Sequence, residues 1–231
     1  MKKEKGIIIA FSGKIGSGKT STATALGDKM FPNNYKIVSF SIPLKAETDT
    51  IVKLIKSLPD KESIDNLLKN SFFDSVNKDK ARHAIEIIFN DVRNGNIVDG
   101  YNKTPELRKF YQYWGTEVRR KENNNYWIIE MDKTVSPLIH KGINIIIDDV
   151  RFENEAYFVL LKKGKLYRLN VDAETRKNRV QDRDGKQTSV NNSHDSETNL
   201  DDFDRFTKSY EISEQETIDD IVNMIISDIE N

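Results

Sequence analysis

The chain has 231 residues, enough for one substantial core or for a core domain that carries an inserted lid or cap. Hydrophobic residues make up 37% and charged residues 32%, and the formal net charge of -1 gives no sign of a nucleic acid or an acidic membrane as partner. The lack of cysteine excludes disulfides and thiolate metal sites, and no apolar run approaches the ~20 residues of a membrane span. We therefore expect a cytoplasmic protein.

The first predicted elements are two strands separated by a helix. Consecutive apolar residues over 7–12 predict a buried strand, and apolar spacing on one face predicts a helix over 17–30. A second strand is predicted over 37–41 and is expected to be closed by Pro43. This order is typical of an α/β protein.

The middle of the chain, 45–140, shows helical patterns and no convincing strand. Helices are expected over three ranges: 81–92, 106–120 and 126–140. The last of them is expected to bend or break at Pro137. We interpret 45–140 as a helical cap inserted into a core made of 1–44 and 141–231.

Strands and helices alternate again in the C-terminal part. Three further strands are predicted, over 143–147, 166–171 and 210–213. The helix after the first of them has five expected landmarks: Glu153 and Glu155 in its first turn, Lys162 and Lys163 in its last, and Gly164 as its C-terminal cap. An amphipathic helix over 218–229 ends the chain. The whole pattern predicts a roughly five-stranded parallel sheet covered by helices.

The segment from Gly13 to Thr20 fits the pattern G-x-x-x-x-G-K-[ST] in full. It falls between a predicted buried strand and a predicted helix, where main-chain N–H groups and a helix N-terminus can surround one phosphate. Lys19 is expected to bridge the outer phosphates of ATP, and the Thr20 hydroxyl to take a place on Mg²⁺. The residues expected to contact ATP are Gly13, Lys14, Gly16, Ser17, Gly18, Lys19, Thr20 and Ser21. The motif predicts a P-loop NTPase fold in three layers.

Two aspartates and an arginine follow the predicted strand 143–147. An acid at the carboxyl end of that strand would lie beside the P-loop and hold Mg²⁺ through water. Adjacent strand residues face opposite ways, so one of Asp148 and Asp149 is expected to bind the metal. The other is expected to cap the next helix or to support the metal site from behind its ligands. Arg151 is expected to clamp a phosphate, and a surface salt bridge, for instance with Glu155, is the alternative.

Arg176, Arg179 and Arg183 lie at spacings of three and four residues on a predicted helix. We interpret 173–200 as an arginine lid that closes over the phosphates, neutralises charge in the transition state and excludes water. With Lys19 and Arg151, these three arginines are the predicted catalytic residues. The alternative is a solvated basic helix balanced by nearby aspartates.

The P-loop and the segments YWGTEVRR…NYW, DDVRFENEA and HDSETNLDDFD together resemble the deoxynucleoside monophosphate kinases of the kind found in bacteriophages. The resemblance extends from residue 13 to about residue 204. It implies Mg²⁺-dependent transfer of the γ-phosphoryl group of ATP to a (deoxy)nucleoside monophosphate, in the cytoplasm or in that of a host. The monophosphate would lie in the crevice between core and cap.

The resemblance also implies roles for single residues. Asp149 would be the Mg²⁺-site acid and Arg151 a phosphate-binding arginine. Five further residues would belong to the acceptor side or the closing loop: Thr116, Arg120, Trp127, His194 and Glu197. Asp148 stands where a small or neutral residue is expected, so the metal ligand stays open, and 57–80 matches nothing in the family.

Other functions are compatible with parts of the sequence. Animal phosphomevalonate kinases share a similar acidic stretch, so the alternatives are a kinase of another small phosphorylated acceptor and a non-catalytic nucleotide-binding module. A GTPase is disfavoured, because the nearest string to N-K-x-D, 102–105, has proline in place of the aspartate. The three histidines are too scattered for a metal site. We expect small-molecule partners only, and the base, the sugar and the oligomeric state, with a homodimer as one option, stay open.

Overall fold

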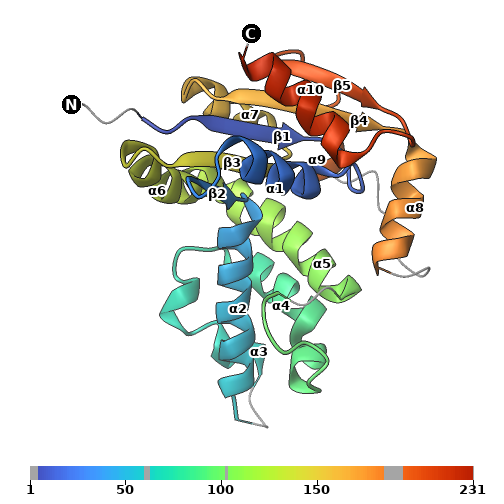
Figure 1. Ribbon diagram of the computed structural model, residues 1–231. Helices are drawn as coiled ribbons and strands as arrows, with labels where there is room; N and C mark the ends of the chain where they lie inside the picture. The colour runs from blue at the N-terminus through green and yellow to red at the C-terminus, as the bar shows by residue number, and fades with distance from the viewer. Residues whose placement is uncertain (1–4, 60–62, 102–103, 185–194, 231) are drawn as a thin grey trace. The chain divides into compact units, whose positions relative to one another are not determined.

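The computed structural model describes residues 5–59, 63–101, 104–184 and 195–230 (Figure 1). The chain divides into two compact units. The first unit combines Met1–Phe40 with Met131–Asn231, and the second unit is Ser41–Glu130. The interpretation of the helical middle of the chain as a substrate-binding cap stays a prediction.

A five-stranded sheet in the order β2-β3-β1-β4-β5 forms the first unit, and each neighbouring pair is parallel. Its strands are β1 (Ile8–Ser12), β2 (Tyr35–Val38), β3 (Asn144–Val150), β4 (Lys165–Val171) and β5 (Lys208–Ile212). This confirms the predicted α/β fold with a five-stranded parallel sheet. The central strand β1 has its two neighbours from later in the chain, so the strand order reverses there, and open α/β sheets bind ligands at the carboxyl ends of strands at such a point.

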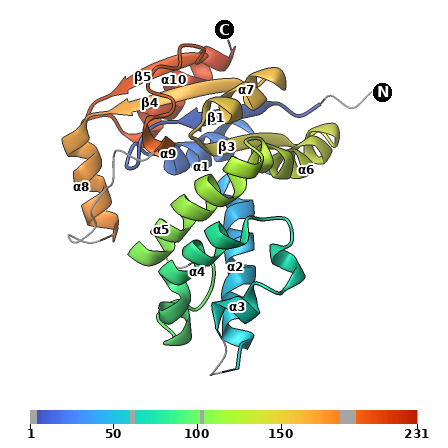
Figure 2. The ribbon, with the colours of Figure 1, turned by 180° about the vertical axis from the view of Figure 1, so that it is seen from behind.

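Helices cover both faces of this sheet. α1 (Lys19–Met30) and α10 (Ile218–Glu230) lie on one face, and α7 (Glu153–Leu161) lies on the other, as the two opposite views show (Figures 1 and 2). On the first face, Leu26 of α1 and Ile225 of α10 are buried against Phe11 of β1. The amphipathic pattern predicted for the last helix therefore describes its buried side correctly.

The second unit is built from helices, and the residues described in it contain no strand. Its elements are α2 (Ser41–Ser57), α3 (Ile64–Leu67), the 3-10 helix η1 (Ser71–Phe73), α4 (Lys78–Arg93), α5 (Pro105–Tyr113) and the π-helix η2 (Trp114–Arg120). α6 (Tyr126–His140) begins in this unit and ends in the first. The helix predicted over 106–120 is thus made of two elements, α5 and η2. π-helical turns are rare in proteins, and those that occur are often found at functional sites.

The strand end expected at Pro43 and the break expected at Pro137 are both absent, and a bend at Pro137 stays a prediction. β2 ends at Val38, and Ser41 already belongs to α2, so Pro43 lies in the first turn of a helix, where its missing N–H costs no hydrogen bond. α6 also runs to His140 through Pro137 without the expected interruption. In both places the helix tolerates the proline.

The end of α7 also differs from its prediction. The helix ends at Leu161, so Lys162 and Lys163 lie beyond its last turn, and Lys163 adopts the left-handed conformation with φ of 60°. Gly164 is needed for another reason: a Cβ there would lie 2.9 Å from the side chains of Ile8 and Val159. The glycine lets the chain pass close to β1 and α7.

Two further helices complete the first unit: α8 (Ala173–Asp184) and the short α9 (Asp195–Thr198). Within the described ranges, no helix is both long enough and apolar enough to cross a bilayer.

Candidate phosphate-binding site

The predicted phosphate-binding loop connects β1 to α1, at the carboxyl end of the central strand. Inside the loop the Ser17 N–H donates to the Lys14 carbonyl at 3.1 Å. Gly16 has a φ of 83°, and a Cβ on it would lie 2.6 Å from the carbonyl oxygen of Arg176. The start of α8 therefore packs directly on the loop, which only glycine allows at this position.

Lys19 turns its ammonium group into the loop. The group is nearly buried, with 8% of the residue exposed, and it donates to the carbonyls of Gly13 at 2.6 Å and Lys14 at 2.9 Å. Burial is the largest cause that lowers the pKa of Lys19 to about 7, and the positive charge of Arg151 adds to it, while nearby carboxylates act in the opposite direction. Because these surroundings disfavour the charged form of Lys19, an anion bound beside it would stabilise the ammonium group.

The two aspartates lie at an irregularity of the sheet. The pairing of β1 with β3 shifts register between Ala10 and Ser12, where one residue of β1 lies opposite two of β3, Asp148 and Asp149. Such a bulge redirects side chains relative to a regular strand.

The bulge gives the two aspartates different partners. Asp148 accepts a hydrogen bond from the Thr20 hydroxyl at 2.8 Å and another from the Ser39 hydroxyl. Asp149 accepts from the main-chain N–H of Phe40 at 2.6 Å. The residue that lies against the metal-ligand candidate of the P-loop is therefore Asp148, whereas the family resemblance implies Asp149.

Arg151 lies at the same edge of the sheet and pairs with Glu197 of α9. One guanidinium nitrogen of Arg151 donates to a Glu197 carboxylate oxygen and, at 3.3 Å, to the Ser196 carbonyl. The other carboxylate oxygen of Glu197 accepts from the Ile15 N–H of the P-loop at 2.9 Å. Glu155 accepts from the main-chain N–H of Arg151 at 2.8 Å. Arg151, Glu197 and the P-loop thus form one connected group.

The arginines of α8 lie beside the loop at its other side. Arg176 donates to the carbonyls of Val171 at 3.0 Å and Ile15 at 3.4 Å. A guanidinium nitrogen of Arg179 lies 4.0 Å from the place of a Cβ on Gly18. His194 and the side chain of Arg183 lie outside the part of the chain that the structure describes. The lid motion of 173–200 stays a prediction.

The three acceptor-side candidates of the second unit are buried or half-buried in it. Trp127 is 3% exposed, and its indole N–H donates to the Gly115 carbonyl at 3.1 Å. Arg120 is 9% exposed and donates to the Asn124 carbonyl at 3.4 Å. Thr116 is half-buried on η2. Their binding roles stay predictions, and Trp127 also has a plain structural function.

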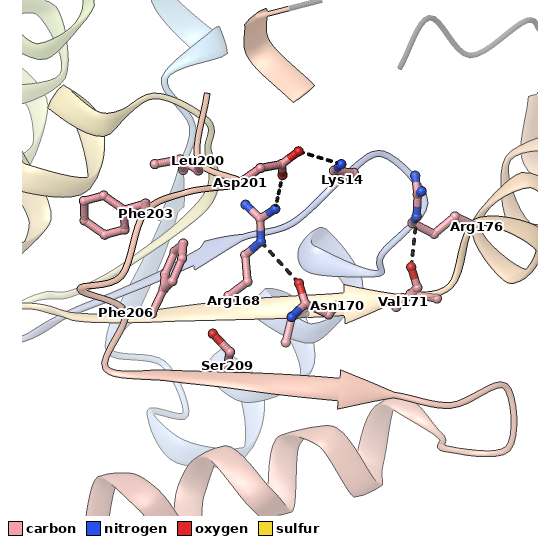
Figure 3. Close-up of a pocket in the computed structure, with 11 residues that line it drawn as sticks. Lys14, Arg168, Asn170, Val171, Arg176, Leu200, Asp201, Phe203, Phe206 and Ser209 are labelled. Atoms are coloured by element: carbon pink, nitrogen blue, oxygen red, sulfur yellow. Dashed lines mark hydrogen bonds and ion pairs between the residues drawn. The ribbon is translucent and has the colours of Figure 1, made fainter. Parts of the chain in front are cut away.

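Sequence reasoning missed three polar residues of the first unit: Ser39, Arg168 and Asp201. Arg168 lies in the buried middle of β4, between Tyr167 and Leu169, and binds Asp201 at 2.8 Å (Figure 3). A charged residue inside a buried strand is a signal that the sequence offered. Ser39 follows β2, at the edge where such sheets bind ligands.

No protein-family model and no protein among the curated sequences matches the chain. Several solved structures are similar in fold. A sugar kinase from Janibacter sp. HTCC2649 has a TM-score of 0.50 at 12% identity, with 97% of this chain and 95% of that chain covered. An identity this low relates the folds and nothing more.

Two other solved structures have lower scores. The APS kinase of Mycobacterium tuberculosis in complex with AMPPNP and APS has a TM-score of 0.43 at 11% identity, with 99% of each chain covered. The dephospho-CoA kinase of Campylobacter jejuni has a TM-score of 0.43 at 14% identity, with 96% of each chain covered. We draw no conclusion from scores in this range.

Proposed function

We propose that the chain is an ATP-dependent kinase that phosphorylates a (deoxy)nucleoside monophosphate. The observation that carries this proposal is the convergence of Lys19, Thr20 and Asp148 at the carboxyl ends of β1 and β3. A complete phosphate-binding motif, a buried ammonium group and a hydroxyl–carboxylate pair are the parts that a P-loop phosphotransferase requires.

The residues at this point fit Mg²⁺, which prefers oxygen ligands and usually takes few of them from the protein. The Thr20 hydroxyl and the Asp148 carboxylate are 2.8 Å apart and both offer oxygen. We assign the metal position to these two residues and a supporting role to Asp149, whose carboxylate accepts from the Phe40 N–H. Bound Mg²⁺ would neutralise charge on the phosphates of ATP.

The chain's own residues would position and neutralise the reacting groups. An oxygen of the acceptor phosphate attacks the γ-phosphorus of ATP, the bond from that phosphorus to the bridging oxygen breaks, and ADP leaves. The acceptor phosphate is already ionised, so no general base is needed. Lys19, Arg151 and the α8 arginines Arg176 and Arg179 supply positive charge around the transferred group.

The resemblance to nucleoside monophosphate kinases supports the choice of acceptor, together with the arginines beside the loop. We propose that Thr116 and Arg120 of the second unit take part in acceptor binding. A kinase of another small phosphorylated molecule would use the same chemistry, since its acceptor group would also be a phosphate. The acceptor assay below separates these functions.

A coupled assay of ADP release tests the proposal. ATP turnover should rise sharply with at least one member of a panel of ribo- and deoxynucleoside monophosphates, because closure of the site requires both substrates. A response to mevalonate phosphate alone would identify the other kinase class. Binding of ATP without acceptor-dependent turnover across the panel would contradict the kinase assignment and favour a non-catalytic module.

A variant of the P-loop lysine sharpens this assay. Lys19→Ala should lower kcat/KM at least ~10³-fold, because the ammonium group is proposed to bind the transferred phosphate. Its thermal melt should stay near that of the parent chain. Lys29→Ala, on the surface of the same helix, is the control and should retain activity. Full activity of Lys19→Ala would overturn the assignment.

A further inference from the structure

A cavity of about 390 Å³ lies over β4, within the first unit (Figure 3). The side chains that matter in its lining are Lys14, Arg168, Arg176, Asp201, Phe203 and Ser209. Lys14 comes from the phosphate-binding loop, Arg176 from α8, and Asp201 from the segment after α9. The volume lies in the range of small-molecule sites, ~300–1,000 Å³.

Positive charge exceeds negative charge in this cavity. Its lining contains three cationic side chains and one carboxylate, which leaves two positive charges in excess. The carboxylate is that of Asp201, and it lies 2.8 Å from Lys14 and 2.8 Å from Arg168. Burial acts to raise the pKa of Asp201, but its contacts with the two cations outweigh burial and hold that pKa below its ordinary value. Asp201 is thus an ionised group between two cations.

Arg168 is held in place before any ligand arrives. It is 9% exposed, and its guanidinium donates to the Ser12 hydroxyl at 3.2 Å and to the Asn170 side-chain carbonyl at 3.3 Å. Figure 3 shows the side chains of Arg168 and Asn170 rising from β4 toward Asp201 and Lys14. A guanidinium already held by protein partners binds a phosphate with little loss of side-chain freedom.

The cavity is separate from the phosphate-binding nest of the P-loop. The nest consists of the main-chain N–H groups around 16–20, and none of these residues lines the cavity. Lys14 is the part of the P-loop that reaches it, and its side chain points to Asp201. An anion in the cavity would therefore occupy a second position beside the loop.

We propose that this cavity binds a small phosphorylated molecule, whose phosphate group replaces the Asp201 carboxylate between Lys14 and Arg168. A phosphate offers more acceptor oxygens and more charge than one carboxylate, and guanidinium groups bind it bidentately. The apolar wall formed by Leu200 and Phe203 fits an organic part on the same molecule. The site does not depend on the kinase assignment.

Titration calorimetry with two probes, inorganic phosphate and phenyl phosphate, tests this site. Comparable affinity for the two would identify the phosphate group alone as the ligand, and tighter binding of phenyl phosphate would identify an organic phosphate. Both results support the proposal when the variants below respond as stated. Failure of both probes to bind at millimolar concentration would overturn it.

Four variants locate the bound probe. Asp201→Asn should tighten binding about threefold or more, because the phosphate no longer competes with a carboxylate. Asp219→Asn makes the same change of charge on α10, across the sheet, and should leave the affinity unchanged. Arg168→Gln should weaken binding about tenfold. Because Arg168 is buried, its replacement can also disturb the fold, so a second variant is needed at an exposed position of the lining. Ser209→Glu is that variant, and its negative charge should weaken binding by repelling the phosphate.

The P-loop nest is the rival location for the probes. Lys19→Ala should retain binding in the cavity. Loss of binding in Lys19→Ala with retention in Ser209→Glu would place the phosphate in the nest and overturn the proposal. An equal effect of Asp201→Asn and Asp219→Asn would show that only overall charge matters and would overturn it too.

Discussion

Each unit of this chain contains an arginine–carboxylate pair that is largely withdrawn from solvent, and the two pairs have different surroundings. In the second unit, Arg119 lies 2.9 Å from Glu47, and their side chains are 6% and 14% exposed. Glu47 also accepts from the indole N–H of Trp114 at 2.7 Å and from the Tyr126 hydroxyl. The Arg119 guanidinium lies 4.7 Å from the Tyr126 ring centre and 5.4 Å from that of Trp114.

The pair in the first unit is more open. The difference lies in the arginine: the Arg151 side chain is 30% exposed, against 6% for Arg119, whereas its partner Glu197 is only 7% exposed. The second carboxylate oxygen of Glu197 accepts from a main-chain group, the N–H of Ile15 in the P-loop. That N–H and the Arg151 guanidinium are groups that a phosphate binds equally well.

The same chemical pair thus has two different sets of partners, side chains in the second unit and the main chain of the P-loop in the first. The partners of the Arg119–Glu47 pair are side chains of the same unit, which suits a structural role. Where the carboxylate uses the main chain of a phosphate-binding loop, an incoming phosphate can replace it. Burial of charge alone therefore does not identify a binding site.

Glu47→Gln tests the closed pair and should have the largest effect on stability. It removes the counter-charge of Arg119 in a nearly buried place, which costs about 3–5 kcal/mol of unfolding free energy. Urea unfolding followed by tryptophan fluorescence measures this. Glu86→Gln, which removes an exposed carboxylate of the same unit, is the control and should change little. A loss below about 1 kcal/mol for Glu47→Gln would remove the distinction between the pairs.

Arg151→Lys tests the open pair through activity. Lysine keeps the charge but loses the planar fork, so kcat/KM for the monophosphate should fall about tenfold or more. The affinity for ATP without acceptor should barely move. Steady-state kinetics with both substrates varied, beside a thermal melt, measures this. Unchanged kinetics would remove Arg151 from the site and weaken the family resemblance.

Glu197→Gln should have a smaller effect, of opposite sign. The amide can still accept from the Ile15 N–H, but the negative charge beside the triphosphate is gone, so ATP should bind about threefold more tightly. The unfolding free energy should fall by less than in Glu47→Gln, because the Arg151 side chain is 30% exposed and keeps water as a partner when its counter-charge is lost. Calorimetric ATP titrations of the two variants and the parent make the comparison. Weaker ATP binding in Glu197→Gln would show that the carboxylate supports the loop and does not compete with phosphate.

Much of the fold was predictable because its signals are local. Apolar runs marked β1 and β3, the glycine spacing of 13–20 marked the loop, and the pattern of α10 followed from its own periodicity. These features depend on residues that are near neighbours in the sequence, and the parallel sheet that they predicted is confirmed.

The features that sequence could not supply depend on distant pairing. The bulge that separates Asp148 from Asp149 arises from the register between β1 and β3. The pair of Arg168 and Asp201 joins residues 33 positions apart, and that of Arg151 and Glu197 joins residues 46 apart. Nothing in the local composition around these residues indicates their partners.

The last prediction concerns pH and has the smallest effect. The pKa of Lys19 is lowered from 10.5 to about 7 by burial and by Arg151, so at about pH 8 the ligand-free chain carries a largely neutral Lys19. A bound triphosphate favours the ammonium form, so ATP binding at that pH should take up a fraction of one proton, and ATP affinity should decline as pH rises above 7. The unfolded chain binds more protons than the folded chain between pH 7 and 10.5, so the contribution of Lys19 to the unfolding free energy rises with pH in that window. Calorimetry in buffers of different ionisation enthalpy measures the uptake, with Lys19→Ala as the control that should show none. Uptake that is equal in the two proteins would assign the proton to another group and would leave Lys19 charged in the ligand-free loop.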